Sequence, residues 1–554
     1  MNFFKSKYYN IYILILFLVL LLTGLNTYKD YGIGIDDKWH RYNGFYWFNY
    51  ILEFTNFENL KETVSYKLDN ISGPTLPQVR DHPLYGVLFD VPAAILEILI
   101  NINDPKDYYE FRHLLNFFYF FVGVIYFFKL LNKRFDNLTS FLGACLYILS
   151  PRIYGDAFYN MKDVVFLTFL VISTYYCFQY FKNNNYKNLI LFSIFTAATI
   201  HMRILGIFLP LVFIFFYFLS LLSNKNEIIH LKKYLIYLSL LFLFLVISWP
   251  YLWSNPILNL LNIFSSLKYA MINIFIFYKG EYINNKVMPF DYIPLWIFMT
   301  TPIIHLILFF LGFYFILVRI FKKLLAVENN TSNYDLWRGL NEKKDLFIFV
   351  NLIAILSLLI LFNGWFNIRL FNGWKHLYFL NFFLVYIATF AIHLLINNHK
   401  FSKAKIIIKL FILLGLVFTI SRMYLYHPYQ GIYFNSIISD KFKNQFDVDF
   451  TALSGKHFLN KIIKLEGKNK KINIGVASWT PIERSFEILN SESRLNFHNV
   501  GQEYMAADYI YTNNISEVDK KINNKYDIPE NFKKLYELNI DGLIIYEMYK
   551  KEIQ

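Results

Sequence analysis

Acidic side chains stand beside basic ones at several places in an otherwise apolar chain. Asp36 and Asp37 are adjacent, and His40 and Arg41 follow them closely. Arg, Lys and His side chains can hold a phosphate group, while a carboxylate can take a proton from an attacking hydroxyl or orient a metal ion. This combination therefore indicates chemistry at a phosphate ester. The alternative is structural, since an adjacent Asp pair can also cap a helix.

Polar segments farther along the chain contain the same residue types. Each has an ordinary explanation when taken alone: His82, which precedes a proline, could lie in a turn, and Asp163 could cap a helix. Arg152 and Lys162 could be interfacial side chains that reach the aqueous phase, and Arg203 could cap a helix end. The candidate residues of these segments are Arg80 and His82, Arg152 and Asp156, Lys162 and Asp163, Arg203, and Lys375 and His376.

The composition is that of a membrane protein. Of the 554 residues, 56% are hydrophobic and only 17% are charged. A soluble domain carries about 25% charged residues, so this chain has too few to cover a globular surface of its size. Cys145 and Cys177 both lie within apolar runs, and we interpret them as core side chains rather than as a disulfide or a metal pair.

Apolar runs of about 20 residues are long enough to cross a bilayer, and we predict eleven of them. Residues 9–27 are interpreted as an uncleaved membrane anchor rather than a signal peptide, since no small-residue cleavage pattern is seen. A shorter apolar segment, 84–100, contains Asp90 and Glu97, and we assign it to an interfacial helix on the outer face. The other predicted spans are 111–131, 135–150, 164–181, 187–201, 203–222, 233–250, 293–318, 345–363, 374–397 and 405–424.

The distribution of basic residues predicts the orientation of these spans. With the N-terminus in the cytoplasm, the inner loops hold the clusters of Lys and Arg, as the positive-inside rule requires. The same rule explains the net charge of +14 without a nucleic-acid partner. We therefore expect a multi-pass protein of the plasma membrane (a bacterial inner membrane) with a periplasmic C-terminus. The inner loops are 129–136, 182–187, 223–233, 319–344 and 398–405.

Two large regions fall on the outer side in this topology. Residues 1–424 form the predicted transmembrane domain, with 28–110 as its long first outer loop. Residues 425–554 are more polar and contain strand-like runs, which predicts a small α/β domain outside the membrane. All the candidate residues lie at the outer face. Ionisable groups at a membrane boundary are costly unless they are paired or hydrated, so their convergence indicates one site.

In their order along the chain, these motifs resemble those of the GT-C glycosyltransferases. The resemblance is to the family that includes protein O-mannosyltransferases and aminoarabinose transferases, with bacterial relatives that use polyprenyl-linked sugars. The family has an acidic pair after the first span, which Asp36 and Asp37 match. Its His-Pro-Pro-Leu-like segment is matched from His82 onward, with one proline missing.

Further elements extend this resemblance along about the first 440 residues. The family's Arg and Asp at the mouth of the fourth span correspond to Arg152 and Asp163, at a longer spacing that leaves Asp156 as a rival. Residues 372–376 and 427–435 resemble elements of the bacterial members, with Lys375 where those have Arg. The resemblance implies a GT-C fold, that is, an all-α polytopic membrane protein.

The resemblance also implies an inverting transfer of a sugar from a polyprenyl-phosphate donor to a lipid, glycan or protein of the cell envelope. Asp36 would be the general base, and Asp37 would orient the acceptor or a metal ion. Carboxylates alone are compatible with a divalent metal ion or with none. The groups expected to bind the substrates are His40, Arg41, Arg80, His82, Arg152, Asp156, Lys162, Arg203, Lys375 and His376, with Asp163 as a further catalytic candidate.

Other membrane functions are compatible with parts of this pattern. A polymerase or ligase of the O-antigen type would share the lipid-phosphate donor, although the early acidic pair argues against it. A transporter would place polar groups near the middle of the bilayer and often shows related halves, whereas the candidates here lie at one face. A structural membrane protein would need no such cluster.

Overall fold

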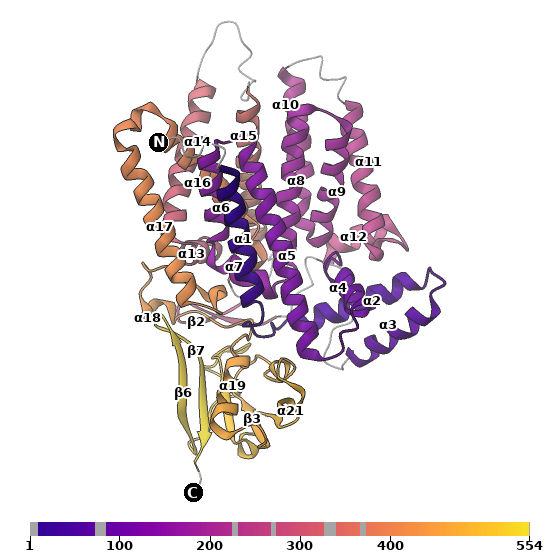
Figure 1. Cartoon of the computed structure of the whole chain (residues 1–554), viewed down its shortest axis with the longest axis vertical. Coiled ribbons are helices and arrows are strands. Elements are labelled where there is room, and N and C mark those ends of the chain that lie inside the picture. Colours follow the sequence, from indigo (N-terminus) through magenta and orange to yellow (C-terminus); the bar gives the residue numbers. More distant parts are fainter. Residues whose placement is uncertain are drawn as a thin grey trace.

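Long apolar helices run side by side through most of this computed structural model, and a small sheet lies at one end of them (Figure 1). The structure describes residues 9–71, 85–223, 231–266, 273–325, 339–365 and 373–552. The long helices are α1 (Tyr9–Thr27), α5 (Pro105–Asn132), α6 (Asn137–Ile148), α8 (Asp163–Asn183), α9 (Tyr186–Met202), α10 (Phe208–Ser223), α11 (Leu231–Ser248), α14 (Ile303–Leu325), α15 (Leu340–Trp365), α16 (Leu380–Asn397) and α17 (Lys405–Leu425).

Seven of the described helices are long and apolar enough to cross a bilayer, namely α1, α5, α8, α11, α14, α16 and α17. The prediction of a polytopic helical membrane protein is thereby confirmed, while the total of eleven spans and their orientation stay predictions. The run 293–318, predicted as one span, is two helices, α13 (Tyr292–Thr300) and α14. The break lies at Thr301, which is extended because a residue before proline is forced out of the helical region.

Side-chain caps fix where several of these helices begin. The carboxylate of Asp104 accepts a hydrogen bond from the Lys106 amide at 2.9 Å, and Pro105 occupies the first turn of α5. Asp136 accepts from the Thr139 amide at 3.1 Å at the start of α6. A cap satisfies an amide that the helix itself leaves unpaired, and proline in the first turn loses nothing by lacking an N–H.

Shorter elements lie at the end of the bundle that carries the sheet, among them α2 (Asp37–Leu52), α3 (Glu58–Ile71), α4 (Asp90–Leu99) and α7 (Pro151–Tyr159) (Figure 1). The ten-residue α4 is too short to be a span, and its place at the membrane interface stays a prediction. A β-hairpin, β1 (Phe275–Tyr278) and β2 (Glu281–Asn284), follows α12 (Pro256–Ser266). No strands were predicted there.

The C-terminal region contains a five-stranded mixed sheet in the order β4-β3-β5-β7-β6, which confirms the predicted small sheet region. Strand β3 pairs in parallel with β4 and β5, whereas β7 pairs antiparallel with β5 and β6. Helix α19 (Gly455–Glu466) buries Phe458, Leu459 and Ile462 in the core of the sheet. The strands are β3 (Ile472–Val476), β4 (Phe497–Gly501), β5 (Tyr509–Thr512), β6 (Phe532–Ile540) and β7 (Leu543–Lys551).

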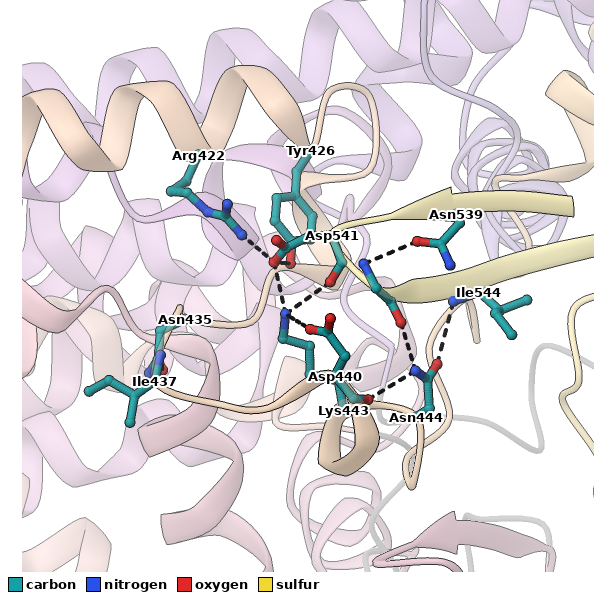
Figure 2. Close-up of polar contacts among 11 residues, drawn as sticks. Arg422, Tyr426, Asn435, Ile437, Asp440, Lys443, Asn444, Asn539, Asp541 and Ile544 are labelled. Carbon is teal, nitrogen blue, oxygen red and sulfur yellow. Dashed lines mark hydrogen bonds and ion pairs between the residues drawn. The ribbon is translucent and has the colours of Figure 1, made fainter.

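A cluster of polar contacts joins the tip of the β6–β7 hairpin to the end of α17 (Figure 2). Asp541 in the hairpin turn accepts hydrogen bonds from Arg422, from the Tyr426 hydroxyl at 2.8 Å and from Lys443 Nζ at 2.9 Å. Asn444 donates to the carbonyl of Gly542 at 2.6 Å. The sheet is therefore held against the bundle by charged groups as well as by packing.

Candidate functional site

The first acid of the adjacent pair faces a lysine from a distant part of the chain. Asp36 stands at the start of α2, yet its side chain caps no helix amide. Its Oδ2 instead accepts a hydrogen bond at 3.2 Å from Nζ of Lys375, which lies in η6 (Lys375–Leu377) just before α16. The Asp36 side chain is 56% exposed and that of Lys375 only 14%. The carboxylate is therefore accessible to a substrate, whereas the Lys375 side chain is mostly buried.

The surroundings of Asp36 keep it ionised. Desolvation by the enclosing protein opposes the charged form, but the charges of Lys375 and His40 outweigh it and hold the pKa of Asp36 below its usual range. The position of Asp36 is set partly by the tail, since the neighbouring Ile35 donates its amide to the carbonyl of Thr451 at 3.0 Å. The ring centroid of Phe450, in the same segment, lies 5.7 Å from Lys375 Nζ.

The second acid of the pair is turned into the protein. Asp37 is fully buried, and its Oδ2 accepts the amide of Gly34 at 2.9 Å. The same oxygen lies 3.4 Å from Nε2 of His113 on α5. The two adjacent acids thus have different surroundings, and the structure closes the turn before α2 with Asp37, not with Asp36. The predicted role of Asp37 in orienting an acceptor or a metal ion stays a prediction.

Two further acids are linked by a single asparagine where α7 leads into α8. Asn160 donates to Asp156 Oδ2 at 2.9 Å and to Asp163 Oδ2 at 3.1 Å. Asp163 also forms an ion pair with Arg203, which directly follows α9. Burial raises the pKa of Asp156 to about 6, against the hydrogen bonds from Asn160 and Tyr159. The two rival candidates of the sequence analysis therefore belong to one network.

Basic side chains gather around these acids. Lys162 lies 3.5 Å from the ring centroid of Tyr85, and burial together with the charge of Arg203 lowers the pKa of Lys162 well below its usual range. Burial also lowers the pKa of His376, and the charges of Arg203, Lys375 and Lys162 lower it further. A bound anion would stabilise the protonated forms of these neighbouring basic groups, which otherwise repel one another. The cluster is therefore suited to binding a phosphate.

Arg152 is a further buried cation among the candidates. It is buried on α7, and its Nε donates to the carbonyl of Tyr433 at 3.1 Å. Its guanidinium packs over the rings of Trp296 and Phe434, at 5.1 and 5.3 Å from their centroids. Among the described residues no carboxylate lies within ion-pair distance of it. A Cβ placed on Gly373 would lie 3.5 Å from Arg152 Nη1, so the segment before Lys375 approaches it closely.

Other candidates of the sequence analysis do not join this cluster. Arg41 is buried against Glu97 of α4, with Nη2 at 2.6 Å from Oε1, and it fixes α2 to α4. His40 also contacts α4, through Asp90 at 3.1 Å. Burial opposes the protonation of His40, but the charges of Asp90 and then of Asp36 raise its pKa. Because His40 bonds Asp90 and only its charge reaches Asp36, we place it at the edge of the site. Arg80 and His82 lie outside the described residues.

Some residues of the site carried no sequence signal. Tyr85 and Phe450 contact Lys162 and Lys375, yet aromatic residues are too frequent in this chain for either to stand out. Asp90 did carry a signal, since an acid within an apolar segment needs a partner. Within the part of the chain that the structure describes, no three His, Cys, Asp or Glu side chains converge as metal ligands.

Comparison with known proteins gives one family match. The family model described as dolichyl-phosphate-mannose-protein mannosyltransferase matches residues 81–255, a segment that includes Arg152, Lys162, Asp163 and Arg203. No curated protein matches the chain.

Solved structures of similar proteins share little sequence identity with this chain. ArnT from Cupriavidus metallidurans bound to undecaprenyl phosphate is 10% identical, with a TM-score of 0.47 over 98% of each chain. The apo oligosaccharyltransferase of Archaeoglobus fulgidus is 11% identical, with a TM-score of 0.49 over 92% of this chain and 70% of that one. The family match confirms, over residues 81–255, the resemblance to protein O-mannosyltransferases predicted from the sequence.

Proposed function

We propose that this protein transfers a sugar from a polyprenyl-phosphate carrier to an acceptor of the cell envelope, with inversion at the anomeric carbon. The observation that carries the proposal is the pair of Asp36 and Lys375, which brings an ionised, accessible carboxylate into a cluster of basic side chains. A general base and an anion-binding group are the two parts that this reaction needs from a protein.

The proposed step balances without a further reactant. The acceptor hydroxyl attacks the anomeric carbon, and its proton passes to Asp36. The bond between that carbon and the phosphate oxygen breaks, and the polyprenyl phosphate leaves with the electron pair. Lys162, Arg203 and Lys375 would stabilise the negative charge that develops on the phosphate, and Arg152 would add to this from the side of α7. Fixed cations in a site of limited water access act strongly on such charge.

The class of donor rests on the family match. The description of that family names dolichyl-phosphate mannose, a sugar linked to a polyprenyl phosphate, and we propose the same class of donor here. The lipid would lie along the apolar helices with its phosphate at the end of the bundle that carries the sheet. We further propose that this end faces the periplasm of a bacterial inner membrane, as the basic inner loops predict.

A deletion strain tests the proposal in the cell. Loss of the gene should cause a lipid-linked sugar to accumulate and remove one sugar from the envelope, because the donor is no longer consumed. A plasmid copy of the wild type should restore both, and the Asp36→Asn variant at the same membrane level should not. Accumulation of a complete lipid-linked glycan would instead indicate a ligase or polymerase. Unchanged lipid-linked sugars and envelope would contradict the proposal.

Replacing Lys375 should shift the pH dependence of transfer. In Lys375→Met the cation that favours ionised Asp36 is gone, so desolvation raises the pKa of Asp36. More of the base is then protonated at a given acidic pH, and the acid limb of kcat/KM moves to higher pH. The control is Lys106→Met, which removes a lysine bonded to Asn490 outside the site and should leave the profile unchanged. An unshifted acid limb in Lys375→Met would contradict the assignment of Asp36 as the base.

A further inference from the structure

A cavity of about 310 Å³ lies beside the proposed active site, between the β1–β2 hairpin and the C-terminal domain. Phe277 and Tyr282 of the hairpin form one wall, and Phe446 and Asp447 of the segment after α18 (Asp440–Lys443) form another. Lys520 of the C-terminal domain forms a third. Pockets for small ligands begin at about this size, roughly 300–1,000 Å³. None of these residues belongs to the cluster around Asp36.

The walls of the cavity are held in place by hydrogen bonds between the three segments. Two hydrogen bonds join Asp447 to Phe277. The Asp447 amide donates to the Phe277 carbonyl at 3.2 Å, and the Phe277 amide donates to Asp447 Oδ2 at 3.1 Å. Phe275 donates its amide to the carbonyl of Glu517 at 2.9 Å. Asn444 bonds Gly542 and Ile544 at the hairpin tip (Figure 2). These hydrogen bonds therefore fix the shape of the cavity at the junction between the domains.

Polar groups in the walls keep unused bonding capacity. Among the described residues, Oδ1 of Asp447 and the hydroxyl of Tyr282 have no hydrogen-bond partner. Nζ of Lys520 makes one bond, to the carbonyl of Asn514 at 3.2 Å, and an ammonium group can make three. Burial raises the pKa of Asp447 to about 7, against the hydrogen bond from the Phe277 amide and the charge of Lys520, so near neutral pH this carboxyl can donate or accept.

The chemistry of these walls favours a neutral polyhydroxylated ligand. One carboxyl and one ammonium group are the charged side chains that line the cavity, so its net charge is small and it lacks the cluster of cations that a phosphate needs. A sugar hydroxyl both donates and accepts, and it can therefore use the carboxyl, the ammonium and the phenol. The rings of Phe277 and Tyr282, with centroids 5.0 Å apart, offer an apolar face for the C–H groups of a sugar ring. Aromatic walls with a few placed polar groups are typical of such pockets.

The cavity and the active site share one segment of the chain. Asp447 lines the cavity, whereas Phe450 lies beside Lys375, and Thr451 binds the residue before Asp36. The stretch from 447 to 451 can span at most about 14 Å. An acceptor longer than one sugar could therefore occupy both places at once.

We propose that this cavity binds a carbohydrate unit of the acceptor, next to the unit that receives the new sugar. The cavity's place in the reaction rests on the proposed function, whereas sugar binding itself does not. The acceptor is thereby assigned to the glycans or glycolipids of the envelope, and a protein acceptor without sugars would not use this cavity.

Saturation-transfer NMR on the full chain in nanodiscs tests the proposal, with methyl glycosides of glucose, galactose, mannose and N-acetylglucosamine as probes. At least one glycoside should receive magnetisation from the wild type. Its affinity should be about tenfold weaker in Tyr282→Ala and in Asp447→Asn, because each change removes a bonding group. Tyr66→Ala and Glu530→Gln replace exposed residues outside the cavity and should bind as the wild type does. Equal thermal unfolding midpoints would show that the variants are folded.

The Asp36→Asn variant separates the two proposals. It should keep glycoside binding in the cavity while losing sugar transfer. Binding that is absent in the wild type, or unchanged in both cavity variants, would overturn the carbohydrate site and leave the proposed transfer reaction standing. Binding lost in the cavity variants, in a protein that consumes no lipid-linked sugar, would support the site and contradict the proposed function.

Discussion

Asp36→Asn is expected to lower the rate of sugar transfer by about 10²–10⁴-fold, the usual contribution of a general base. The carboxamide keeps the shape of the side chain and can still accept a hydrogen bond from Lys375, at 3.2 Å in the structure. It cannot take a proton from the acceptor. The turnover of purified variants, compared at equal amounts of inserted protein, measures the effect.

If Asp36 had only a structural role, Asp36→Asn would lower the thermal unfolding midpoint and leave the turnover of the folded protein unchanged. Its side chain caps no amide and is more than half exposed, so the thermal unfolding midpoint of Asp36→Asn should stay near that of the wild type. Asp107→Asn is the matched control, since Asp107 is an exposed acid in the first turn of α5 and should lose neither activity nor stability. Full activity of Asp36→Asn would remove the proposed mechanism.

Removing the ion pair of Arg203 and Asp163 is expected to give the second large effect. A single change leaves the other charge buried and alone, which costs about 3–5 kcal/mol of stability and would obscure the catalytic loss. The double variant Arg203→Gln, Asp163→Asn avoids this, because two neutral amide groups replace the pair. If Arg203 stabilises the leaving phosphate, this folded double variant should still lose about 10²–10³-fold in kcat.

The alternative is that Arg203 serves only as the partner of Asp163 in holding α9 against α8. The double variant should then recover both stability and transfer, and the role of Arg203 at the phosphate would be contradicted. Arg134 and Asp345, a similarly buried pair between other elements, provide the control. Their replacement by Gln and Asn should alter stability without a matching loss of kcat in the protein that remains folded.

The long helices could be predicted because each corresponds to a continuous apolar run in the sequence. Helix α1 ends at Thr27, as expected from the sequence, and α17 ends one residue beyond its predicted limit. The break at Thr301 was missed, although the proline that follows it was visible. The β1–β2 hairpin was also missed, because four-residue strands have a weak pattern and this hairpin depends on a bridge from Tyr278 to Phe446, far along the chain.

The sequence placed Asp36 and Lys375 at one face of the membrane, and the structure brings the two side chains into contact. That they belong to one catalytic site stays a prediction. Arg41 is the counterexample. It belongs to the same motif as Asp36, but α2 turns it toward Glu97. The sequence could show that Glu97 needs a partner, but it could not show which base would supply it, because that depends on how α2 and α4 pack.

The contrast between Asp36 and Asp37 was likewise beyond the sequence. Adjacent residues at a helix start point in different directions, and which one faces solvent depends on the packing of that helix. The structure buries Asp37 beside His113 and leaves Asp36 accessible. Phe450 and Thr451 belong to a region whose part in the site could not be inferred from any motif.

The most direct test of the central claim uses the lipid-linked sugar that accumulates in a deletion strain. This lipid would be extracted and supplied, with envelope material of the same strain as acceptor, to the purified protein in nanodiscs. The wild type should release free polyprenyl phosphate in a one-to-one ratio with the sugar transferred, and Asp36→Asn should release almost none. Transfer from a soluble nucleotide sugar without any lipid carrier, or equal release by Asp36→Asn, would contradict the account.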